Sequence, residues 1–210
     1  MVTLRQPETP PEFVDRFLVT CEAYKIPVVI LLSKIDLQDA EAVAAFRAVY
    51  EGAGYEVLEV SATDGTGVER VRELLAGCRT LVSGNSGVGK STLIRTIDPT
   101  LDIRTGEISE SHHKGRHTTT FSTMYPLAGG GAVIDTPGIK GFGLLDIDDA
   151  ELWHYFPEMM RTAPGCRFYN CTHTHEPGCA VIEAVRRGDI SLARYESYLK
   201  ILDEDDKYRK

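Results

Sequence analysis

Apolar residues recur along this chain at a helical spacing in some stretches and as short continuous runs in others. The spacing predicts helices over residues 13–24, 40–50 and 68–75 and from Lys90 onward, and the runs predict strands over residues 28–32, 57–60 and 80–82. Helices and strands therefore alternate, and a polar loop follows each strand. This alternation is typical of an α/β fold, in which helices cover both faces of a mostly parallel sheet.

The pattern changes after about Thr118. Residues 121–127 and 132–135 resemble strands, and the three glycines at 129–131 are typical of a tight turn between them. We therefore expect a hairpin that adds an antiparallel edge to the sheet.

Beyond Asp148 the chain becomes helical and rich in cysteine. Helices are expected over residues 150–156 and 181–187 and from Ser191, and the cysteines lie between the first two. The sequence therefore predicts two domains, over residues 1–148 and 149–210.

Composition narrows the class of protein. The chain has 210 residues, of which 42% are hydrophobic and 26% charged, as in globular proteins. With 31 acidic against 23 basic residues, the net charge of −8 excludes a surface that binds nucleic acid everywhere, so any such contact must be local. No apolar run approaches the roughly 20 residues that span a bilayer, and no signal pattern follows Met1. We expect a cytoplasmic protein with no membrane partner.

The first chemical motif is a glycine-rich segment between a predicted strand and a predicted helix. It comprises Ser83, Gly84, Asn85, Ser86, Gly87, Val88, Gly89, Lys90, Ser91 and Thr92, and it fits the phosphate-binding loop pattern. Glycines let successive backbone N–H groups surround a β-phosphate, while Lys90 reaches the outer phosphates and the Ser91 hydroxyl can bind Mg²⁺. The segment predicts a nucleotide site.

Two further segments could recognise the base. Ser33, Lys34, Ile35 and Asp36 follow an apolar strand, and Ser61 with Ala62 follows the next one. The Asp36 carboxylate could accept hydrogen bonds from guanine N1–H and the 2-amino group, which adenine does not offer as a pair. Lys34 would lay its alkyl stem over the base, and a backbone N–H of the Ser61-Ala62 loop would meet guanine O6. Each segment alone is also compatible with a solvated loop.

The later motifs complete a GTPase set. Asp135 and Gly138, in Asp135-Thr136-Pro137-Gly138, would contact Mg²⁺ through water and the γ-phosphate respectively. Thr119 is the expected switch ligand of Mg²⁺, with Thr118 and an ordinary strand as the alternatives.

Ile139 stands where many GTPases have a glutamine that orients water. His117 is therefore the candidate for that task, with an exposed histidine in a basic loop as the alternative. Lys90, His117 and Thr119 are the expected catalytic residues.

The order of these motifs differs from that of ordinary GTPases, because the base readers come before the phosphate-binding loop and the switch residues follow it. Together with the stretch Gly115-Arg116-His117-Thr118-Thr119-Thr120 and the cysteine cluster, this order resembles the circularly permuted GTPases of the RsgA family of small ribosomal subunit biogenesis GTPases.

The resemblance implies GTP binding and hydrolysis in late maturation of the small (30S) ribosomal subunit, with contact to its rRNA. It also points to His117 as the residue that orients water. The family usually begins with an oligonucleotide-binding barrel, which does not fit before Pro27, and it commonly has Asn or Thr at the position of Ser33.

The cysteine cluster has the composition of a zinc site. Cys166, Cys171, His173 and Cys179 supply three thiolates and an imidazole, which suit tetrahedral Zn²⁺, and the family resemblance points to the same four ligands. His175 competes with His173, while Cys21 and Cys78 are expected in the core. Arg167, Arg186 and Arg187 are candidates for rRNA contact or for an ordinary solvated face.

The sequence thus predicts a monomeric GTPase that uses Mg²⁺ with GTP or GDP and carries one structural Zn²⁺. The alternative is a nucleotide-dependent rRNA-binding module whose hydrolysis is negligible without its ribosomal partner. An ATP-using enzyme is disfavoured by Asp36.

Overall fold

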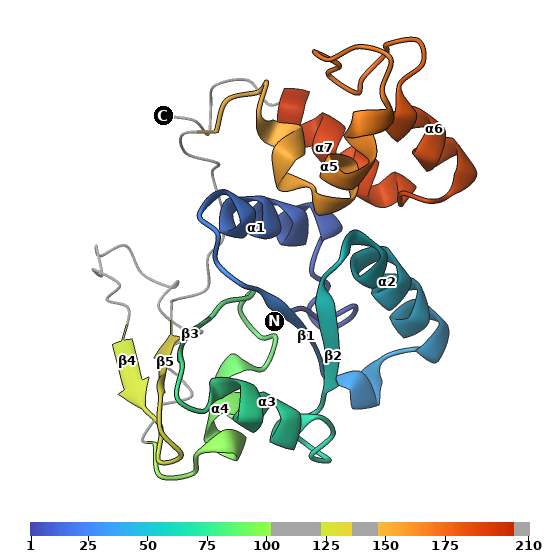
Figure 1. The fold of residues 1–210 in the computed structure, drawn as a ribbon. Coiled ribbons are helices and arrows are strands. Elements are labelled where there is room, and N and C mark those ends of the chain that lie inside the picture. The colour runs from blue at the N-terminus through green and yellow to red at the C-terminus, as the bar shows by residue number, and fades with distance from the viewer. Residues whose placement is uncertain (102–122, 136–146, 204–210) are drawn as a thin grey trace, which may run out of the picture. The chain divides into compact units, whose positions relative to one another are not determined.

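The computed structural model describes residues 1–101, 123–135 and 147–203, which form the α/β arrangement that the sequence predicts (Figure 1). The helices are α1 (Pro11–Ala23), α2 (Ala40–Ala53), α3 (Val68–Leu75), α4 (Lys90–Ile97), α5 (Pro157–Thr162), α6 (Ala180–Arg187) and α7 (Leu192–Asp203). The strands are β1 (Val29–Ser33), β2 (Glu56–Val60), β3 (Arg79–Val82), β4 (Thr123–Pro126) and β5 (Ala132–Asp135). Within the described ranges no helix is long and apolar enough to cross a membrane.

In the described residues the strands form two small sheets, where the sequence predicts one larger sheet. β1 pairs with β2, while β3, β5 and β4 form a second sheet in that spatial order. β5 runs parallel to β3 and antiparallel to β4, which confirms the predicted hairpin at an edge. The N-terminal residues lie alongside both sheets, because Val2 makes an isolated parallel bridge to Leu32 and the Met1 nitrogen donates to the Ser83 carbonyl.

The described chain divides into two compact units. The first contains residues 1–9, 30–40 and the described part of 58–140, and the second contains residues 10–29, 41–57 and the described part of 141–210. In the first unit the apolar faces of α3 and α4 pack with β3 and β5 around buried residues that include Val71, Ile94 and Val133. In the second unit the core includes Val19, Phe156 and Tyr198. α1 and α2 thus pack in the same unit as the C-terminal helices.

A glycine shapes the turn of the β4–β5 hairpin. Gly131 has a φ of +85°, which L side chains rarely adopt. A Cβ atom there would lie 2.5 Å from the Cys78 carbonyl oxygen and 2.6 Å from that of Leu75. Glycine therefore lets the hairpin turn approach the end of α3 closely, and the Ala132 N–H donates to the same Cys78 carbonyl at 2.8 Å.

Two predictions for individual segments are wrong. The helix predicted over residues 150–156 is a 3₁₀ turn, Leu152–Tyr155, and a separate helix, α5, begins at Pro157. Proline lacks an N–H and disfavours helical geometry in the residue before it, and Phe156 accordingly is extended, with φ −112° and ψ 97°. Cys78 is exposed in the turn before β3, although Cys21 is buried as predicted.

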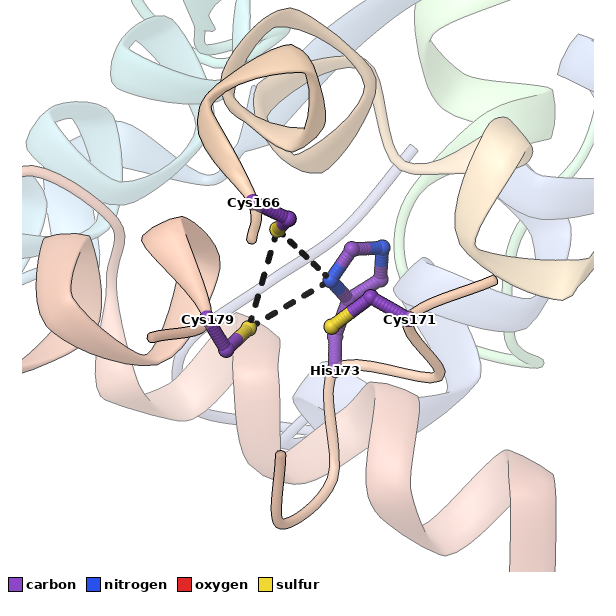
Figure 2. A group of neighbouring side chains, drawn as sticks. All are labelled: Cys166, Cys171, His173 and Cys179. Atoms are coloured by element: carbon purple, nitrogen blue, oxygen red, sulfur yellow. Dashed lines mark hydrogen bonds between the residues drawn. The ribbon is translucent and has the colours of Figure 1, made fainter. Parts of the chain in front are cut away.

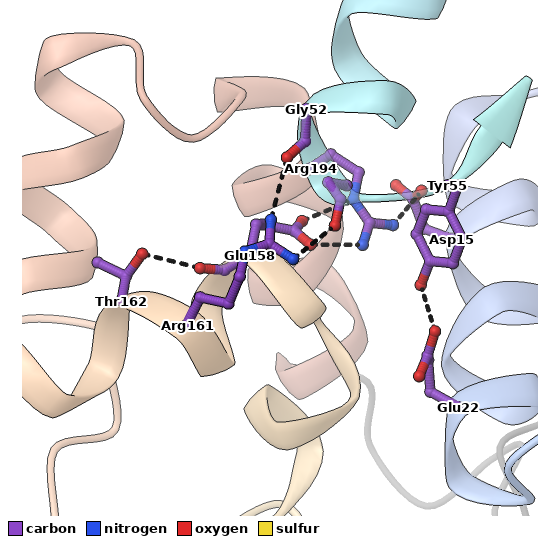
Figure 3. Close-up of polar contacts among 9 residues, drawn as sticks. Asp15, Glu22, Gly52, Tyr55, Glu158, Arg161, Thr162 and Arg194 are labelled. Atoms are coloured by element: carbon purple, nitrogen blue, oxygen red, sulfur yellow. Dashed lines mark hydrogen bonds and ion pairs between the residues drawn. The ribbon is translucent and has the colours of Figure 1, made fainter.

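A buried arginine ties the elements of the second unit together (Figure 3). Arg194 of α7 is 1% exposed; it donates to both carboxylate oxygens of Glu158, at 2.8 and 3.2 Å, and to Asp15 of α1 at 2.7 Å. Its guanidinium also lies over the ring of Phe156. Burial alone lowers the pKa of Arg194, but the two carboxylates outweigh it and raise that pKa above its usual value, so the side chain stays charged.

A second arginine joins α5 to the end of α2. Arg161 donates to the carbonyls of Ala53 and Gly52, both at 3.1 Å, which satisfies acceptors that the helix end leaves without intrahelical partners. Tyr55, just beyond α2, donates to Glu22 of α1 at 3.1 Å. These contacts and the buried ion pairs of Arg194, whose loss would cost about 3–5 kcal/mol, hold α1, α2 and the C-terminal helices in one structural unit.

Candidate functional site

The predicted nucleotide-binding residues gather where three strands end. Ser33 is the last residue of β1, while Ser61 and Ser83 directly follow β2 and β3, and all three are buried. The Ser33 Oγ lies 3.4 Å from the place that a Cβ atom on Gly89 would take. The base-reading segment and the phosphate-binding loop, which are far apart in sequence, therefore lie close together.

The phosphate-binding loop has the backbone that its glycines predict. Gly84, Gly87 and Gly89 have φ angles of 155°, 83° and 99°. A Cβ atom on Gly84 would lie 2.3 Å from the Met1 carbonyl oxygen, so no side chain fits at that position. Gly89 caps the N-terminus of α4, where backbone N–H groups and the helix dipole favour an anion.

Lys90, the first residue of α4, turns its charge into the loop. Its side chain is 3% exposed, and Nζ donates to the carbonyls of Gly84 at 2.6 Å and Asn85 at 2.9 Å. The ammonium is thus held at the centre of the loop, where phosphate oxygens can replace these carbonyl partners.

The remaining loop residues differ in their exposure to solvent. Val88 is fully buried, whereas Ser86 and Gly87 are exposed. Ser91 is half-buried in the first turn of α4, and Thr92 beside it is exposed. The Ser83 hydroxyl is buried and has no hydrogen-bond partner among the described residues.

The base-reading segment is a tight turn. Lys34 adopts a left-handed backbone with φ 56°, and the 3₁₀ turn Ile35–Leu37 follows it. The Lys34 carbonyl accepts hydrogen bonds from the Leu37 N–H at 2.9 Å and the Gln38 side chain at 3.1 Å. Asp36 is exposed within this turn.

The loop after β2 is held by its own hydroxyl. Ser61 Oγ accepts from the N–H groups of Thr63 at 3.2 Å and Asp64 at 3.3 Å, while the Ser61 N–H donates to the Thr66 carbonyl. Hydrogen bonds from Thr66 lower the pKa of Asp64. Ala62 is therefore presented by a loop with a defined shape.

Asp135 lies at the end of β5, beside the end of the strand that leads into the phosphate-binding loop. It is the last residue of β5 and pairs in register with Val82, the last residue of β3. His117, Thr118, Thr119 and Gly138, as well as Ile139, lie outside the described residues. The predictions for these positions are therefore neither confirmed nor contradicted.

The second candidate site lies in the other unit. Figure 2 shows Cys166, Cys171, His173 and Cys179 pointing toward one another, and their ligand atoms all lie within 4.8 Å of each other. His173 Nδ1 is 3.6 Å from Cys166 Sγ and 3.5 Å from Cys179 Sγ, and the two sulfurs are 3.9 Å apart. Of the two histidines that the sequence offers, His173 is the one in this group.

The three distances among Cys166, His173 and Cys179 fit a tetrahedral zinc ion. With Zn–S bonds of about 2.3 Å and Zn–N bonds of about 2.0 Å, tetrahedral angles place ligand sulfurs about 3.8 Å apart and sulfur about 3.5 Å from nitrogen. Burial lowers the pKa of His173, which keeps the imidazole neutral, and raises the pKa of the Cys171 thiol to about 12. Three neighbouring thiols, two of them buried, are stable as thiolates once a cation neutralises them.

Two tyrosines of α7 position the ligand loop. Tyr195 donates to the His173 carbonyl at 2.8 Å, and Tyr198 donates to the Thr172 carbonyl at 2.6 Å. His173 has a left-handed backbone with φ 60°, and the ring of Trp153 meets its imidazole edge to face. These contacts aim Nδ1 at the sulfurs, while Nε2 is buried without a partner in the described residues.

Glu176 is a residue of this candidate site that the sequence analysis does not predict. Its carboxylate accepts from the N–H groups of Thr172 at 2.7 Å, Thr174 at 3.1 Å and His175 at 3.2 Å, and from the Thr172 hydroxyl at 2.6 Å. Burial alone raises the pKa of Glu176, but these hydrogen bonds outweigh it and hold the pKa well below its ordinary value. A carboxylate thus fixes the loop that carries two ligands, and its position after Thr-His-Thr-His gives no distinct signal.

The three arginines considered for rRNA contact have partners within the chain. Arg186 pairs with Glu183, Arg187 pairs with Asp189 at 2.8 Å, and Arg167 lies over the ring of Phe168. All of these contacts are local in sequence, as on an ordinary solvated face.

Comparisons with known proteins agree on one family. The family model of the RsgA GTPase matches residues 1–145. The chain is 52% identical to the small ribosomal subunit biogenesis GTPase RsgA of Porphyromonas gingivalis, over 99% of this chain and 68% of the relative. It is 50% identical to the protein of the same name from Bacteroides fragilis, over 100% of this chain and 69% of the relative.

Two solved structures share the fold. The structure of YjeQ from Thermotoga maritima aligns with 96% of this chain and over 68% of the YjeQ chain, with a TM-score of 0.81 and 37% sequence identity. YloQ, described as a circularly permuted GTPase, matches 95% of this chain and 64% of its own, with a TM-score of 0.72 and 28% identity. The predicted fold class, a circularly permuted GTPase with a Cys₃His cluster, is confirmed.

Proposed function

This chain belongs to the RsgA GTPase family, and from that premise we propose that it binds GTP and hydrolyses it in the biogenesis of the small ribosomal subunit. The observation that supports the proposal is the close approach of Ser33, at the end of β1, to Gly89 of the phosphate-binding loop, because these segments would bind the two ends of one nucleotide despite their permuted order. The chain would act in the cytoplasm as a monomer, with the small subunit and its rRNA as partners.

The nucleotide would lie across the strand ends of the first unit. Asp36 would accept the guanine N1–H and 2-amino groups, and the stem of Lys34 would cover the base. The Ser61 N–H already donates to Thr66, so we assign the donor for guanine O6 to the N–H of Ala62. Ser33 would support the base through its buried hydroxyl.

The phosphates would occupy the loop from Ser83 to Thr92. Backbone N–H groups would surround the β-phosphate and Lys90 would bind the outer phosphates. Ser91, Thr119 and, through water, Asp135 would hold Mg²⁺, which neutralises phosphate charge when bound. The Gly138 N–H would respond to the γ-phosphate.

The base assignment predicts a change of specificity. Asp36→Asn should weaken GDP binding and favour xanthosine diphosphate by about tenfold or more, because an amide can donate to the 2-carbonyl of xanthine where a carboxylate cannot. Titration of both variants with GDP, xanthosine diphosphate and ADP measures this. Asp39→Asn, which changes an exposed acid three residues away, should leave the preference for GDP intact. Equal affinity of the parent chain for ADP and GDP would contradict the proposal.

We also propose that His117 orients the attacking water, since Ile139 offers no polar group where many GTPases have a glutamine. His117→Ala should lower the rate of GTP hydrolysis on small subunits by about 10²-fold while GTP affinity stays within a few-fold. The measurement is single-turnover hydrolysis with and without small subunits. His112→Ala, from the same basic segment, serves as the control, and an unchanged rate for His117→Ala would assign the water to another group.

The C-terminal part would hold one structural Zn²⁺ through Cys166, Cys171, His173 and Cys179. Three thiolates and one imidazole leave no open position, so the ion would stabilise the fold and take no part in hydrolysis. We retain the division into residues 1–148 and 149–210 as a proposal about function, in which the first part carries the nucleotide chemistry and the second the metal.

A further inference from the structure

The N-terminal segment Thr3–Thr9, here called the strap, forms a closed loop. The Thr9 N–H donates to the Thr3 carbonyl at 2.9 Å, and the Thr3 N–H donates to Thr9 Oγ1 at 3.2 Å. The Thr3 hydroxyl donates to the Pro7 carbonyl inside the loop. Both threonines are buried, at 0% and 6% exposure. The N–H, carbonyl and hydroxyl of Thr3 are all paired within the strap, which gives a short loop a defined shape.

The strap touches both halves of the nucleotide site. It directly follows Val2, whose N–H donates to the Leu31 carbonyl at 2.9 Å and whose carbonyl accepts from the Ser33 N–H of β1 at 2.8 Å. The carbonyl of Gln6 accepts a hydrogen bond from Lys34 Nζ at 2.5 Å. On its other side, the Pro7 ring lies 3.5 Å from the place of a Cβ atom on Gly87 of the phosphate-binding loop.

The two residues joined by this hydrogen bond both have unusual backbones. Gln6 and Lys34 have φ angles of 55° and 56°, a region that residues other than glycine rarely adopt. Such conformations persist where surrounding contacts hold them, and they cluster at functional sites. The left-handed turn at Gln6 aims its carbonyl at Lys34, while its own side chain is exposed.

We propose that the strap positions the guanine-binding lysine relative to the phosphate-binding loop, with Gln6 and Pro7 as positioning residues. The Gln6 carbonyl holds the ammonium of Lys34, so the alkyl stem is already extended when the base arrives. Pro7 packs against Gly87, so the base-reading and phosphate-binding loops keep a fixed separation. This inference rests on the proposed function, because it assumes that Lys34 covers a guanine.

Two variants at Gln6 distinguish the effect of its backbone conformation from the effect of losing its side chain. Gln6→Val and Gln6→Gly both remove the exposed amide, but a β-branched residue strongly disfavours a φ of 55° and glycine accepts it. In the 210-residue chain, Gln6→Val should weaken binding of a fluorescent GDP analogue by about fivefold or more, since a charge-assisted hydrogen bond is lost. Gln6→Gly should stay within about twofold of the parent. KM for GTP should rise in Gln6→Val while kcat is unchanged.

A second background tests whether the effect passes through Lys34. Lys34→Met keeps an unbranched stem and removes the ammonium, so Gln6→Val and Gln6→Gly should bind GDP equally well when combined with it. If Gln6→Val loses as much affinity in the Lys34→Met background as in the parent, the strap is a scaffold and the inference is overturned. It is also overturned if Gln6→Val binds GDP as the parent does. A parent chain that binds no GDP would instead refute the proposed function.

Discussion

Lys90→Met should lower the affinity of the chain for GDP and GTP by about 10³-fold, because two charge-assisted hydrogen bonds to phosphate oxygens are lost from a buried site. Lys90 is 3% exposed, and its ammonium is held at the centre of the phosphate-binding loop by the Gly84 and Asn85 carbonyls. Methionine keeps the length of the stem and its packing. Isothermal titration with each nucleotide measures the loss.

Arg95→Met is the matched control for this prediction. Arg95 is an exposed base in the last turn of the same helix, α4, so its removal changes the net charge equally without touching the loop. Its affinity for GDP should stay within about twofold, apart from a small long-range effect that salt screens. A similar loss in both variants would show that general charge, and not the position of Lys90, supports nucleotide binding.

Local chemistry explains why much of the fold follows from the sequence. α3 begins at Val68 and ends at Leu75 as predicted, because an apolar face at helical spacing lies between two glycines with positive φ, Gly67 and Gly77. The helix expected over residues 150–156 is wrong because apolar spacing continues through Phe156, whereas Pro157 begins a new helix. The apolar spacing in this segment identifies residues that face the core, but it does not reveal that Pro157 ends one turn and begins the next helix.

Site residues were predictable where the residue type itself, through its backbone freedom or its donor atoms, indicates the chemistry. The glycines of the phosphate-binding loop need positive φ, and Cys166, Cys171, His173 and Cys179 have the donor atoms that zinc prefers. Contacts between distant segments were not predictable in this way. Asp15 and Arg194 are 179 residues apart, and nothing near either residue in the sequence indicates the other.

The strap and Glu176 show the same limit within the sites themselves. The Gln6 carbonyl is a backbone atom, so no side chain in the sequence marks it as the partner of Lys34. Glu176 binds three backbone N–H groups, which every residue carries. Hydrogen bonds between a side chain and a distant backbone atom can therefore be found only in a structure.

Cys171→Ser should abolish stoichiometric zinc binding and loosen the C-terminal helices of the second unit. Structural zinc supplies an apparent folding free energy of about 10–16 kcal/mol in small domains, comparable to the whole stability of a typical domain. Cys171 and Cys179 also belong to the core that contains Phe156 and Tyr198, so opening the ligand loop removes core contacts as well. Metal analysis should give one zinc per parent chain and less than about one tenth in the variant. Limited proteolysis should then cleave among the C-terminal helices.

Cys78→Ser distinguishes loss of a ligand from loss of a cysteine. Cys78 is exposed and lies in the turn before β3, outside the cluster, so this variant should keep one zinc and the parent's resistance to protease. The residues proposed to bind the nucleotide lie in the first unit, and Cys171→Ser should therefore still bind GDP within a few-fold of the parent. A Cys171→Ser protein that retains one zinc per chain would show that three ligands suffice. A Cys171→Ser protein that loses zinc but keeps its protease resistance would show that the apolar core and the Arg194 ion pairs hold the second unit together without the metal.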